Sequence, residues 1–309
     1  MGEQQEESDD DGVLINKEGF PLAPEVWHKM WKRAETLHPS GKKMTHAIRG
    51  SQDIPNVPLS SPPTLKNTQS IPEKLLLIQK YISELQYDYT GLQFFEIRKG
   101  RPLCRLMDVA KSIIRESLPI KCLEAVVLAI YLTSDLPSVQ RFPLAFKTTF
   151  ENNTFKHIVL GVFYNGKFGA LGLSRRDTLM YKSLKYDTLY DLLTEFTRCY
   201  EDCYHRVDRI KLGLPVSHDN QSMEAVMWKY TYIRLSKLST KEFKHTCDSY
   251  SKQLRGKVQL LAPYQTAHQM KYAKQSMDAS KTIITDVSDN SSSGSARSKC
   301  QKLNKGNSR

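Results

Sequence analysis

Three residues of this 309-residue chain could together form a thiol-based catalytic site: Cys122, His157 and Ser174. A thiol nucleophile needs a base that takes up its proton and a third group that fixes the histidine tautomer from its other ring nitrogen. Cys122 ends "LPIKC", directly before the apolar run "LEAVVLAIYL", so we expect it near the start of a buried helix. The helix dipole and neighbouring Lys121 would then favour the thiolate.

A β-hairpin would bring the histidine and the serine together. The segment "FKHIVLGVFYNGKFGALGLSRR" has β-rich arms on either side of Asn165-Gly166, a strong signal for a two-residue type I′ turn. Such a turn fixes the register. Counting outward from it, His157 faces Ser174 at a non-hydrogen-bonded position, where facing side chains lie closest. A bulge would shift this register.

Each of these residues also has a plainer interpretation. A single cysteine in an apolar run is more often a packed small residue, and a histidine alternating with valine is more often an ordinary sheet residue. Ser174, followed by Arg175-Arg176, can simply end a strand. The three together favour catalysis more than any one alone. The interpretation requires that Cys122 lie against the hairpin.

The charge of the chain predicts an acidic partner. The formal net charge is +12, although six acidic residues stand among the first eleven. Residues 91–190 contain nearly twice as many Lys and Arg as Asp and Glu. Nucleic acid, an anionic membrane and an acidic protein segment all suit such a surface. The bases are not interleaved with aromatic residues in a pattern typical of RNA binding, which makes nucleic acid the poorer match.

Composition also predicts where the protein works. No apolar run approaches the roughly 18 residues that cross a bilayer, and the acidic start "MGEQQEESDDDG" does not resemble a signal peptide. We therefore expect a cytoplasmic protein that does not enter the membrane, with six cysteines as free thiols. We expect no metal or organic cofactor, because Cys199 and Cys203, with His205 nearby, lack the second ligand pair of a zinc site.

The chain divides into four parts by composition. We predict an acidic disordered tail, a mostly helical N-terminal domain, a catalytic domain and a disordered Ser/Lys-rich tail. These parts span residues 1–12, 13–116, 117–262 and 263–309. A Pro/Ser-rich connector occupies residues 50–69.

The expected fold is α+β, with an antiparallel sheet packed on helices. The segment 70–85 opens with Ser70 as N-cap and Pro72 in the first turn. Apolar residues recur at helical spacing in the other predicted helices as well. These helices span residues 23–38, about 188–211 and about 222–261.

Several blocks of the chain resemble the vasohibins, which are tubulin tyrosine carboxypeptidases of the transglutaminase-like cysteine protease group. The blocks are "VLINKEGFPLAPEVWHKMW", "TGLQFFEIRKGRPL", "RESLPIKCLEAVVLAIYLT", "RFPLAFKTTF" and "HIVLGVFYNGKFGALGLSRRDTLMYK". The resemblance covers roughly residues 13–262 and implies a transglutaminase-like protease core. It also implies removal of the C-terminal tyrosine of α-tubulin, whose glutamate-rich tail suits a basic protein.

The resemblance implies a role for each matching residue. Cys122 would be the nucleophile, His157 the general base, and Ser174 the third member, which orients the histidine through its backbone carbonyl as much as its side chain. Lys121 and Arg175 would hold the carboxylate of the substrate, and Tyr87 would line the groove. Three further bases would attract the glutamates of the tail: Lys99, Arg101 and Lys147.

The stripe formed by Trp27, Met30 and Trp31 has two interpretations. Aromatic stripes at helical spacing are usually part of a core. The resemblance implies instead that this part packs with a short helical protein, the small vasohibin-binding protein. One departure from the family pattern concerns the substrate: position 187 is Asp where a base is expected, and Lys185 stands close enough to compensate in part.

Two other functions compete with this interpretation. A basic, non-catalytic module that binds microtubules or RNA would have the same charge. An acyltransferase of transglutaminase type would also use a cysteine, but that chemistry normally has Asp where Ser174 stands. For the carboxypeptidase we expect a microtubule-associated location in the cytoplasm, without excluding secretion by a route that needs no signal peptide.

Overall fold

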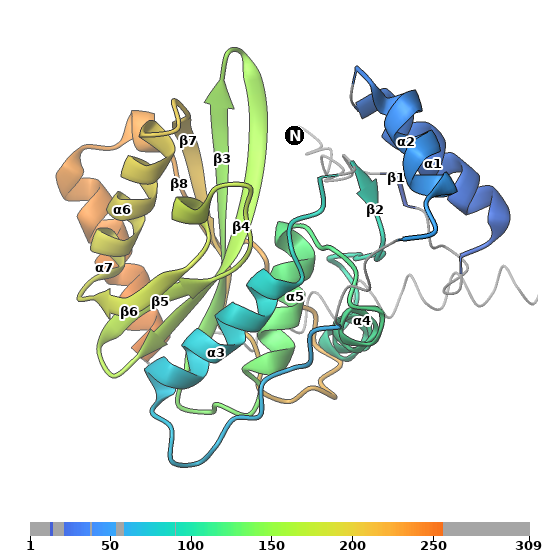
Figure 1. Ribbon diagram of the computed structural model, residues 1–309. Helices are drawn as coiled ribbons and strands as arrows, with labels where there is room; N and C mark the ends of the chain where they lie inside the picture. The colour runs from blue at the N-terminus through green and yellow to red at the C-terminus, as the bar shows by residue number, and fades with distance from the viewer. Residues whose placement is uncertain (1–12, 15–21, 38, 54–58, 90, 256–309) are drawn as a thin grey trace, which may run out of the picture. The chain divides into compact units, whose positions relative to one another are not determined.

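A six-stranded antiparallel sheet forms the centre of the molecule (Figure 1). This computed structural model describes residues 13–14, 22–37, 39–53, 59–89 and 91–255. The strand order is β6-β5-β4-β3-β7-β8, so β6 and β8 are the two edges. The strands are β3 (Gln140–Phe150), β4 (Asn153–Tyr164), β5 (Lys167–Leu171), β6 (Lys182–Tyr186), β7 (Arg206–Leu212) and β8 (Thr231–Ile233).

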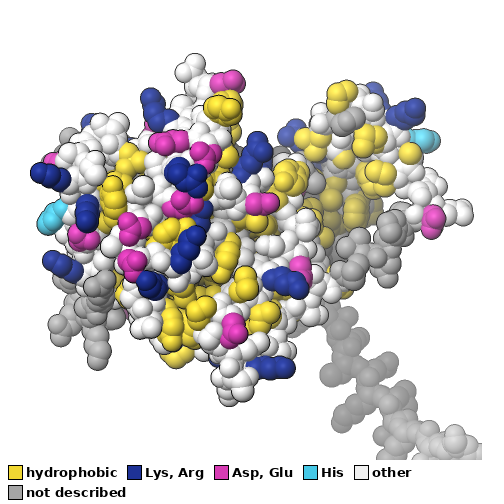
Figure 2. All heavy atoms as spheres, turned by 60° about the vertical axis from the view of Figure 1, so that its left-hand side comes forward, with side chains coloured by type: hydrophobic (Ala, Val, Ile, Leu, Met, Phe, Trp, Pro, Cys, Tyr) yellow, Lys and Arg dark blue, Asp and Glu magenta, His cyan; other side chains and the backbone are white. Residues whose placement is uncertain are grey.

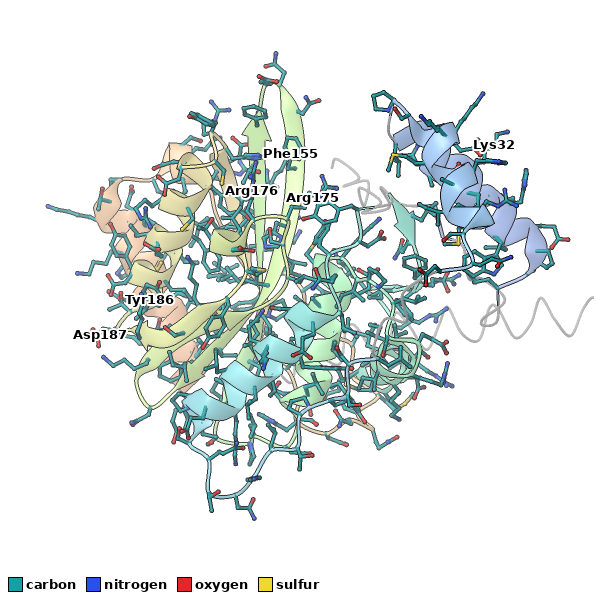
Figure 3. All side chains as sticks on the ribbon, in the orientation of Figure 1. Lys32, Phe155, Arg175, Arg176, Tyr186 and Asp187 are labelled. Carbon is teal, nitrogen blue, oxygen red and sulfur yellow. The ribbon has the colours of Figure 1, made fainter. Side chains whose placement is uncertain are left out.

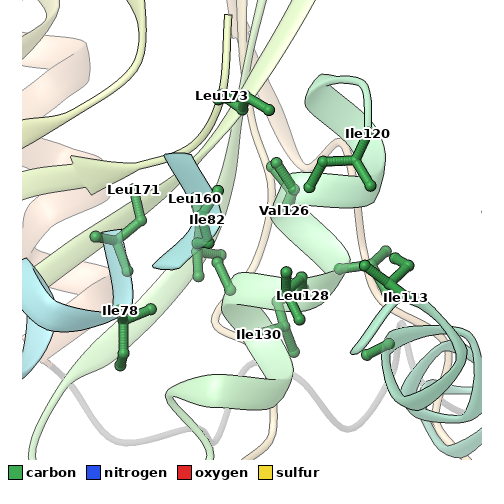
Figure 4. Packing of buried hydrophobic residues seen from close by; sticks show 14 of the residues in the cluster. Ile78, Ile82, Ile113, Ile120, Val126, Leu128, Ile130, Leu160, Leu171 and Leu173 are labelled. Carbon is green, nitrogen blue, oxygen red and sulfur yellow. The ribbon is translucent and has the colours of Figure 1, made fainter. Parts of the chain in front are cut away.

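Helices cover both faces of the sheet and create two hydrophobic cores. Side chains alternate along β4, so Ile158 and Leu160 join the larger core while Val159 joins the smaller one. The larger core contains α3 (Ile71–Glu84), α4 (Leu103–Glu116) and α5 (Cys122–Leu132), and Figure 4 shows its packing. The smaller core contains α6 (Leu189–Glu201) and α7 (Thr240–Arg255).

Helix α5 is buried on nearly all sides. Every residue from Glu124 to Ile130 is buried, as expected for a helix that is apolar all round. It packs between β4 on one side and α3 and α4 on the other. The rigidity of this surrounding fixes the position of its first residue, Cys122.

The remaining elements lie near the chain's N-terminus and in short turns. Strands β1 (Val13–Leu14) and β2 (Leu92–Gln93) form a separate two-stranded parallel sheet. Helices α1 (Pro24–Leu37) and α2 (Gly41–Gly50) contact each other, and Val26 and Met30 of α1 pack against the larger core. Two 3₁₀ turns complete the structure: η1 (Asp177–Leu179) and η2 (Leu235–Lys237).

The predicted α+β class is confirmed, and so are several local signals. Helix α3 begins after Ser70 with a capping box: Ser70 Oγ accepts from the Glu73 N–H, and the Glu73 carboxylate accepts from the Ser70 N–H. Asn165 and Gly166 both have positive φ, as a type I′ turn requires, and Tyr164 pairs with Lys167. The transglutaminase-like core stays a prediction.

Two predicted helices are wrong in part. The helix expected over 188–211 ends at Glu201, and its last third is β7. Tyr204 takes a left-handed conformation with φ of 63°, which reverses the chain between the two elements. Of the helix expected over 222–261, residues 240–255 form α7, residues 222–239 form loops, β8 and η2, and residues 256–261 lie outside the described residues. Apolar spacing in that region serves packing on α4 and β7 instead.

Only part of the domain prediction concerns residues that the structure describes. The predicted tails, residues 1–12 and 263–309, lie outside the described residues. The boundary at residue 116 stays a prediction, although the larger core takes side chains from both sides of it. In the part of the chain that the structure describes, no helix is both long and apolar enough to cross a membrane.

Candidate active site

Cys122 lies at the N-terminus of α5, against the open edge of β4. Lys121 is the N-cap residue of the helix, and Cys122 is half-buried. The backbone N–H of Ile158 donates a hydrogen bond to the thiol. Ile158 follows His157 in β4, so the thiol lies one residue along the strand from the expected base. The requirement that Cys122 lie against the hairpin is therefore met.

The open edge exists because β5 ends early. The ladder between β4 and β5 runs from Tyr164/Lys167 only to Leu160/Leu171. In this register the Ile158 N–H points toward the place where β5 would continue. The missing strand leaves that N–H for the thiol of Cys122.

Gln79 of α3 ends the ladder. Its side-chain amide is buried, accepts a hydrogen bond from the Gly172 N–H at 3.0 Å and donates one to the Gly172 carbonyl at 2.8 Å. Both backbone groups of Gly172 are thus bound to α3 and not to β4. The chain then leaves the sheet and carries Ser174, Arg175 and η1 past the site. Gln79 is a positioning residue that pattern analysis of the sequence did not find.

His157 is oriented by a backbone carbonyl. Its Nε2 lies 2.8 Å from the carbonyl oxygen of Leu179, the last residue of η1. A carbonyl only accepts, so Nε2 carries the proton and Nδ1 is the nitrogen that can take one up. His157 pairs with Phe146 across the ladder, and Phe146 and Leu179 both belong to the smaller core. The same packing that builds this core therefore sets the tautomer.

The expected pairing of His157 with Ser174 is not part of the hairpin, because the ladder stops before it. The Ser174 hydroxyl instead accepts a hydrogen bond from the Arg176 N–H at 3.3 Å. The backbone carbonyl at His157 Nε2 comes from Leu179, whereas the resemblance implied that Ser174 supplies one. A catalytic role of the Ser174 side chain stays a prediction.

The resting thiol is neutral, contrary to the expectation from the helix dipole. Burial raises the pKa of Cys122, and nearby Glu124 raises it further, while the Ile158 N–H and the charge of Lys99 lower it less. Burial also lowers the pKa of His157 to about 4, against a smaller opposing effect of the Leu179 carbonyl. At neutral pH Cys122 is therefore a thiol and His157 a neutral imidazole.

This pair predicts an unusually low acidic limit of activity. The reaction needs neutral His157, so kcat/KM for peptide cleavage should hold down to about pH 5 and fall below it. The profile should be measured with a substrate whose glutamates are replaced by glutamines, so that the terminal carboxylate, which titrates at about pH 3.5, is the only substrate carboxylate that remains. An acidic limb centred near pH 6.5 would contradict the buried, neutral imidazole.

A buried carboxyl lies in the first turn of α5. Burial raises the pKa of Glu124 to about 7, and Asp88 adds to the effect while Lys121 opposes it. Both Glu124 and Asp88 are almost completely buried. In the sequence, Glu124 stands inside the apolar run that follows Cys122.

Glu124→Gln should change stability only at high pH. A raised pKa means that the folded state binds a proton more tightly than the unfolded state, so this stability is full below about pH 4.5 and is lost as pH rises through about 7. The glutamine imitates the protonated acid. We expect little change in the free energy of unfolding at pH 5 and a gain of order 2 to 3 kcal/mol at pH 8.5. Urea unfolding at both pH values measures it, and equal effects at both would contradict the prediction.

Tyr87 and Arg175 lie together beside the nucleophile. The Arg175 guanidinium carbon is 5.4 Å from the centre of the Tyr87 ring. Burial raises the pKa of Tyr87, and the charge of Arg175 and its hydrogen bond lower it less. Tyr87 is held by a bridge to Ile120: the Asp88 N–H donates to the Ile120 carbonyl at 2.9 Å. This bridge joins the groove wall directly to the start of α5.

The other predicted substrate-binding residues differ in the groups with which they interact. Lys99 acts electrostatically on Cys122, and Lys121 acts on Glu124. Arg101 forms an ion pair with Glu96 at 3.4 Å. Lys147 lies on β3, between Lys156 and Arg209 on the neighbouring strands.

Position 187 lies away from this site. Figure 3 shows Asp187 and Tyr186 at the opposite end of the sheet from Arg175. Asp187, directly after β6, forms an ion pair with Lys167 of the neighbouring strand β5, and Lys185 lies over the Tyr186 ring, 5.4 Å from its centre.

The predicted partner stripe is divided between core and solvent. Met30 packs on the larger core, whereas Trp27 is 47% exposed. Trp31 is half-buried and lies under the Arg49 guanidinium, 5.6 Å away. Hydrophobic side chains gather on the surface of the α1/α2 pair (Figure 2), among them Leu37, Met44 and Ile48.

Neither a disulfide bond nor a metal site is formed among the residues that the structure describes. The five cysteines of the described residues are free, and Cys300 lies outside them. Cys199 is buried, 3.3 Å from the Lys182 ammonium. Within the described ranges, no group of three or more His, Cys, Asp or Glu side chains is arranged to hold a metal ion.

Comparisons with known proteins identify the family of the chain. A model of the family described as Vasohibin matches residues 12–255. The chain is 45% identical over 258 residues to mouse "Tubulinyl-Tyr carboxypeptidase 1". The aligned region covers 83% of this chain and 69% of the mouse protein. These matches span the thiol, the imidazole, the ladder end and the groove wall together, and the chain belongs to the vasohibin family.

Proposed function

We propose that this protein is a cysteine carboxypeptidase that removes the C-terminal tyrosine of α-tubulin. The observation that carries the proposal is the thiol of Cys122, which lies beside the strand residue next to an imidazole of fixed tautomer. The similarity to the mouse tubulinyl-Tyr carboxypeptidase supports the reaction class and the substrate. Such an enzyme would act in the cytoplasm, on microtubules.

The reaction would proceed through a thioester. Nδ1 of His157 takes the thiol proton, and the Cys122 thiolate attacks the carbonyl carbon before the terminal tyrosine. The imidazolium then protonates the departing amine, so free tyrosine leaves and the peptide is bound to sulfur. Water, deprotonated by His157, breaks the thioester. Backbone N–H groups of the first turn of α5, including that of Leu123 beside the thiol, are candidate donors to the oxyanion.

The surrounding bases would select a free C-terminus in an acidic tail. Arg175, held over the Tyr87 ring, and Lys121 would bind the terminal carboxylate through charge-assisted hydrogen bonds. Lys99, Arg101 and Lys147 would attract glutamates and steer association more than they add to affinity. No metal or organic cofactor takes part in this scheme.

A partner would cover the α1/α2 surface. The exposed side chains of Trp27, Leu37, Met44 and Ile48 leave a hydrophobic patch that the described residues do not cover. The small vasohibin-binding protein, a short helical protein, fits such a patch. The enzyme should therefore be tested as a co-expressed complex.

The test is the release of tyrosine from two matched peptides. Both carry an α-tubulin tail sequence ending in Glu-Glu-Tyr, one with a free carboxylate and one amidated. We expect free tyrosine, measured by mass spectrometry, only from the first. Cleavage of both peptides would indicate a protease without exopeptidase recognition. Binding of microtubules without any release from peptide or polymer would favour the non-catalytic module.

A further inference from the structure

Three positive side chains surround an exposed tyrosine on the edge strand β8. The guanidinium carbon of Arg209 is 5.5 Å from the centre of the Tyr232 ring, and the Lys229 ammonium and the Arg234 guanidinium carbon are each 5.7 Å away. Tyr232 is 46% exposed. Among the described residues, no carboxylate forms an ion pair with any of these three cations. We call these four residues the Tyr232 cluster.

The positive charges of the Tyr232 cluster are not balanced by an ion pair with a carboxylate of the described residues. A tyrosine ring attracts one cation over its face, but three like charges around one ring repel one another. By contrast, exposed Arg198 pairs with Glu195 and Asp202. An anionic ligand would remove the repulsion in the Tyr232 cluster, and the tyrosine hydroxyl could donate to it.

The sheet connects the Tyr232 cluster to the nucleophile. Ile158, Ala145, Lys211 and Tyr232 pair in sequence across β4, β3, β7 and β8, so their side chains share one face. The row begins at Ile158, whose N–H donates to the Cys122 thiol. The adjacent row contains three bases on neighbouring strands: Lys156, Lys147 and Arg209. This row adds positive charge to the face between the thiol and the Tyr232 cluster, which suits an acidic peptide.

A second connection runs through the groove wall. The indole N–H of Trp228 donates to the Lys99 carbonyl at 2.8 Å, and the next residue is Lys229 of the cluster. The Lys99 charge acts on the Cys122 thiol. The two ends of this surface are therefore fixed relative to each other by the sheet and by the Lys99–Trp228 contact.

We propose that the Tyr232 cluster is a second recognition site for the substrate, one that binds acidic residues well upstream of the cleaved bond. Three strand spacings of about 4.8 Å separate β4 from β8, and the thiol lies about one further spacing away on the β5 side of β4, so the total is about 19 Å, which about six extended residues cover. The cluster would thus bind glutamates about five to seven residues before the terminal tyrosine. This inference rests on the proposed function and names the part of the substrate that sets specificity.

The test compares substrate lengths in the complex with its partner. A short peptide, Glu-Glu-Tyr, cannot reach β8, whereas a ten-residue peptide with upstream glutamates can. We expect Arg209→Gln/Arg234→Gln to raise KM for the long peptide about three- to fivefold, and to leave kcat and the short peptide unchanged. Replacing the upstream glutamates of the long peptide by glutamines should raise KM by the same factor in the wild-type enzyme. The same replacement should not raise KM further in the double variant. Lys244→Gln, an exposed α7 base on the other face, is the matched charge control.

Several outcomes would overturn the proposal. If the double variant changes KM equally for both peptides, or for neither, the cluster does not bind upstream residues of the substrate. In either case, cleavage of the peptides by the wild-type enzyme would still support the proposed function. If wild type cleaves neither peptide, the proposed function fails, and fluorescence anisotropy of the labelled long peptide tests the cluster alone. Binding weakened by the double variant would then support an acidic-peptide site. Unchanged peptide binding with weakened binding of a single-stranded oligonucleotide would assign the cluster to nucleic acid and refute the proposal.

Discussion

Cys122→Ala is expected to lower the rate of tyrosine release by at least about four orders of magnitude, because it removes the atom that forms the thioester. The residue is half-buried and its thiol accepts hydrogen bonds only from the backbone N–H groups of Ile158 and Leu123, so the fold should persist. Stopped assays with the co-expressed complex and mass spectrometry of free tyrosine measure the loss.

The chain offers a matched control for this substitution. Cys104→Ala removes another half-buried free thiol, on α4, and should leave the rate within about twofold. His157→Gln should be nearly as inactive as Cys122→Ala, and the double variant should lose little more, since the two residues act as a unit. Equal tyrosine release by Cys122→Ala and wild type would place the nucleophile elsewhere.

Arg141→Leu is expected to cause the largest loss of stability of any single substitution considered. Arg141 is completely buried on β3, and burial lowers its pKa to about 10. Its guanidinium donates to the carbonyls of Ile130, Val216 and Ser217, at 2.8, 3.2 and 2.7 Å. Leucine would leave these acceptors unpaired inside the protein, so the free energy of unfolding should fall by about 3 kcal/mol or more.

Urea unfolding followed by tryptophan fluorescence measures this effect. Arg98→Leu, an exposed arginine paired only with Glu96, should change the free energy of unfolding by less than about 0.5 kcal/mol. Arg141 binds the C-terminal end of α5, whereas Cys122 begins it. Activity per folded molecule at low temperature should therefore survive. A stable Arg141→Leu protein would mean that water satisfies the three carbonyls.

Local features of the sequence predicted local structure well. Asn165-Gly166 fixed a turn because few residues adopt positive φ twice in succession, and Ser70 and Glu73 cap α3 through contacts within four residues. The apolar run after Cys122 predicted a buried helix because no periodic polar face interrupts it. Each of these signals is complete within a short stretch of chain.

Features decided by distant contacts were not predictable. The 222–239 segment has helical spacing of apolar residues, yet its backbone hydrogen bonds go to α4: the Leu103 N–H donates to Glu224 and the Cys104 N–H to Ser222. The hairpin register was correct, but its end depended on Gln79, 93 residues from Gly172 in sequence.

The candidate site likewise contains residues that could be predicted from the sequence and contacts that could not. Cys122 and His157 were found because their side chains carry the chemistry. The partner of His157 is a backbone carbonyl, which any residue at position 179 would supply, so no side-chain pattern marks it. The thiolate expectation failed because burial of Cys122 depends on how α5 packs against β4, and that burial outweighs the nearby charge.

The two hydrogen bonds between Gln79 and Gly172 mean that the catalytic half of the chain is not autonomous. A fragment starting at residue 117 would retain the thiol, the imidazole and the Leu179 carbonyl, but β5 would be free to continue along β4 and occupy the edge that the thiol now uses. The helix that shapes the site is thus made before the nucleophile during synthesis. The smallest active piece of this protein should begin ahead of Ile71, where that helix starts.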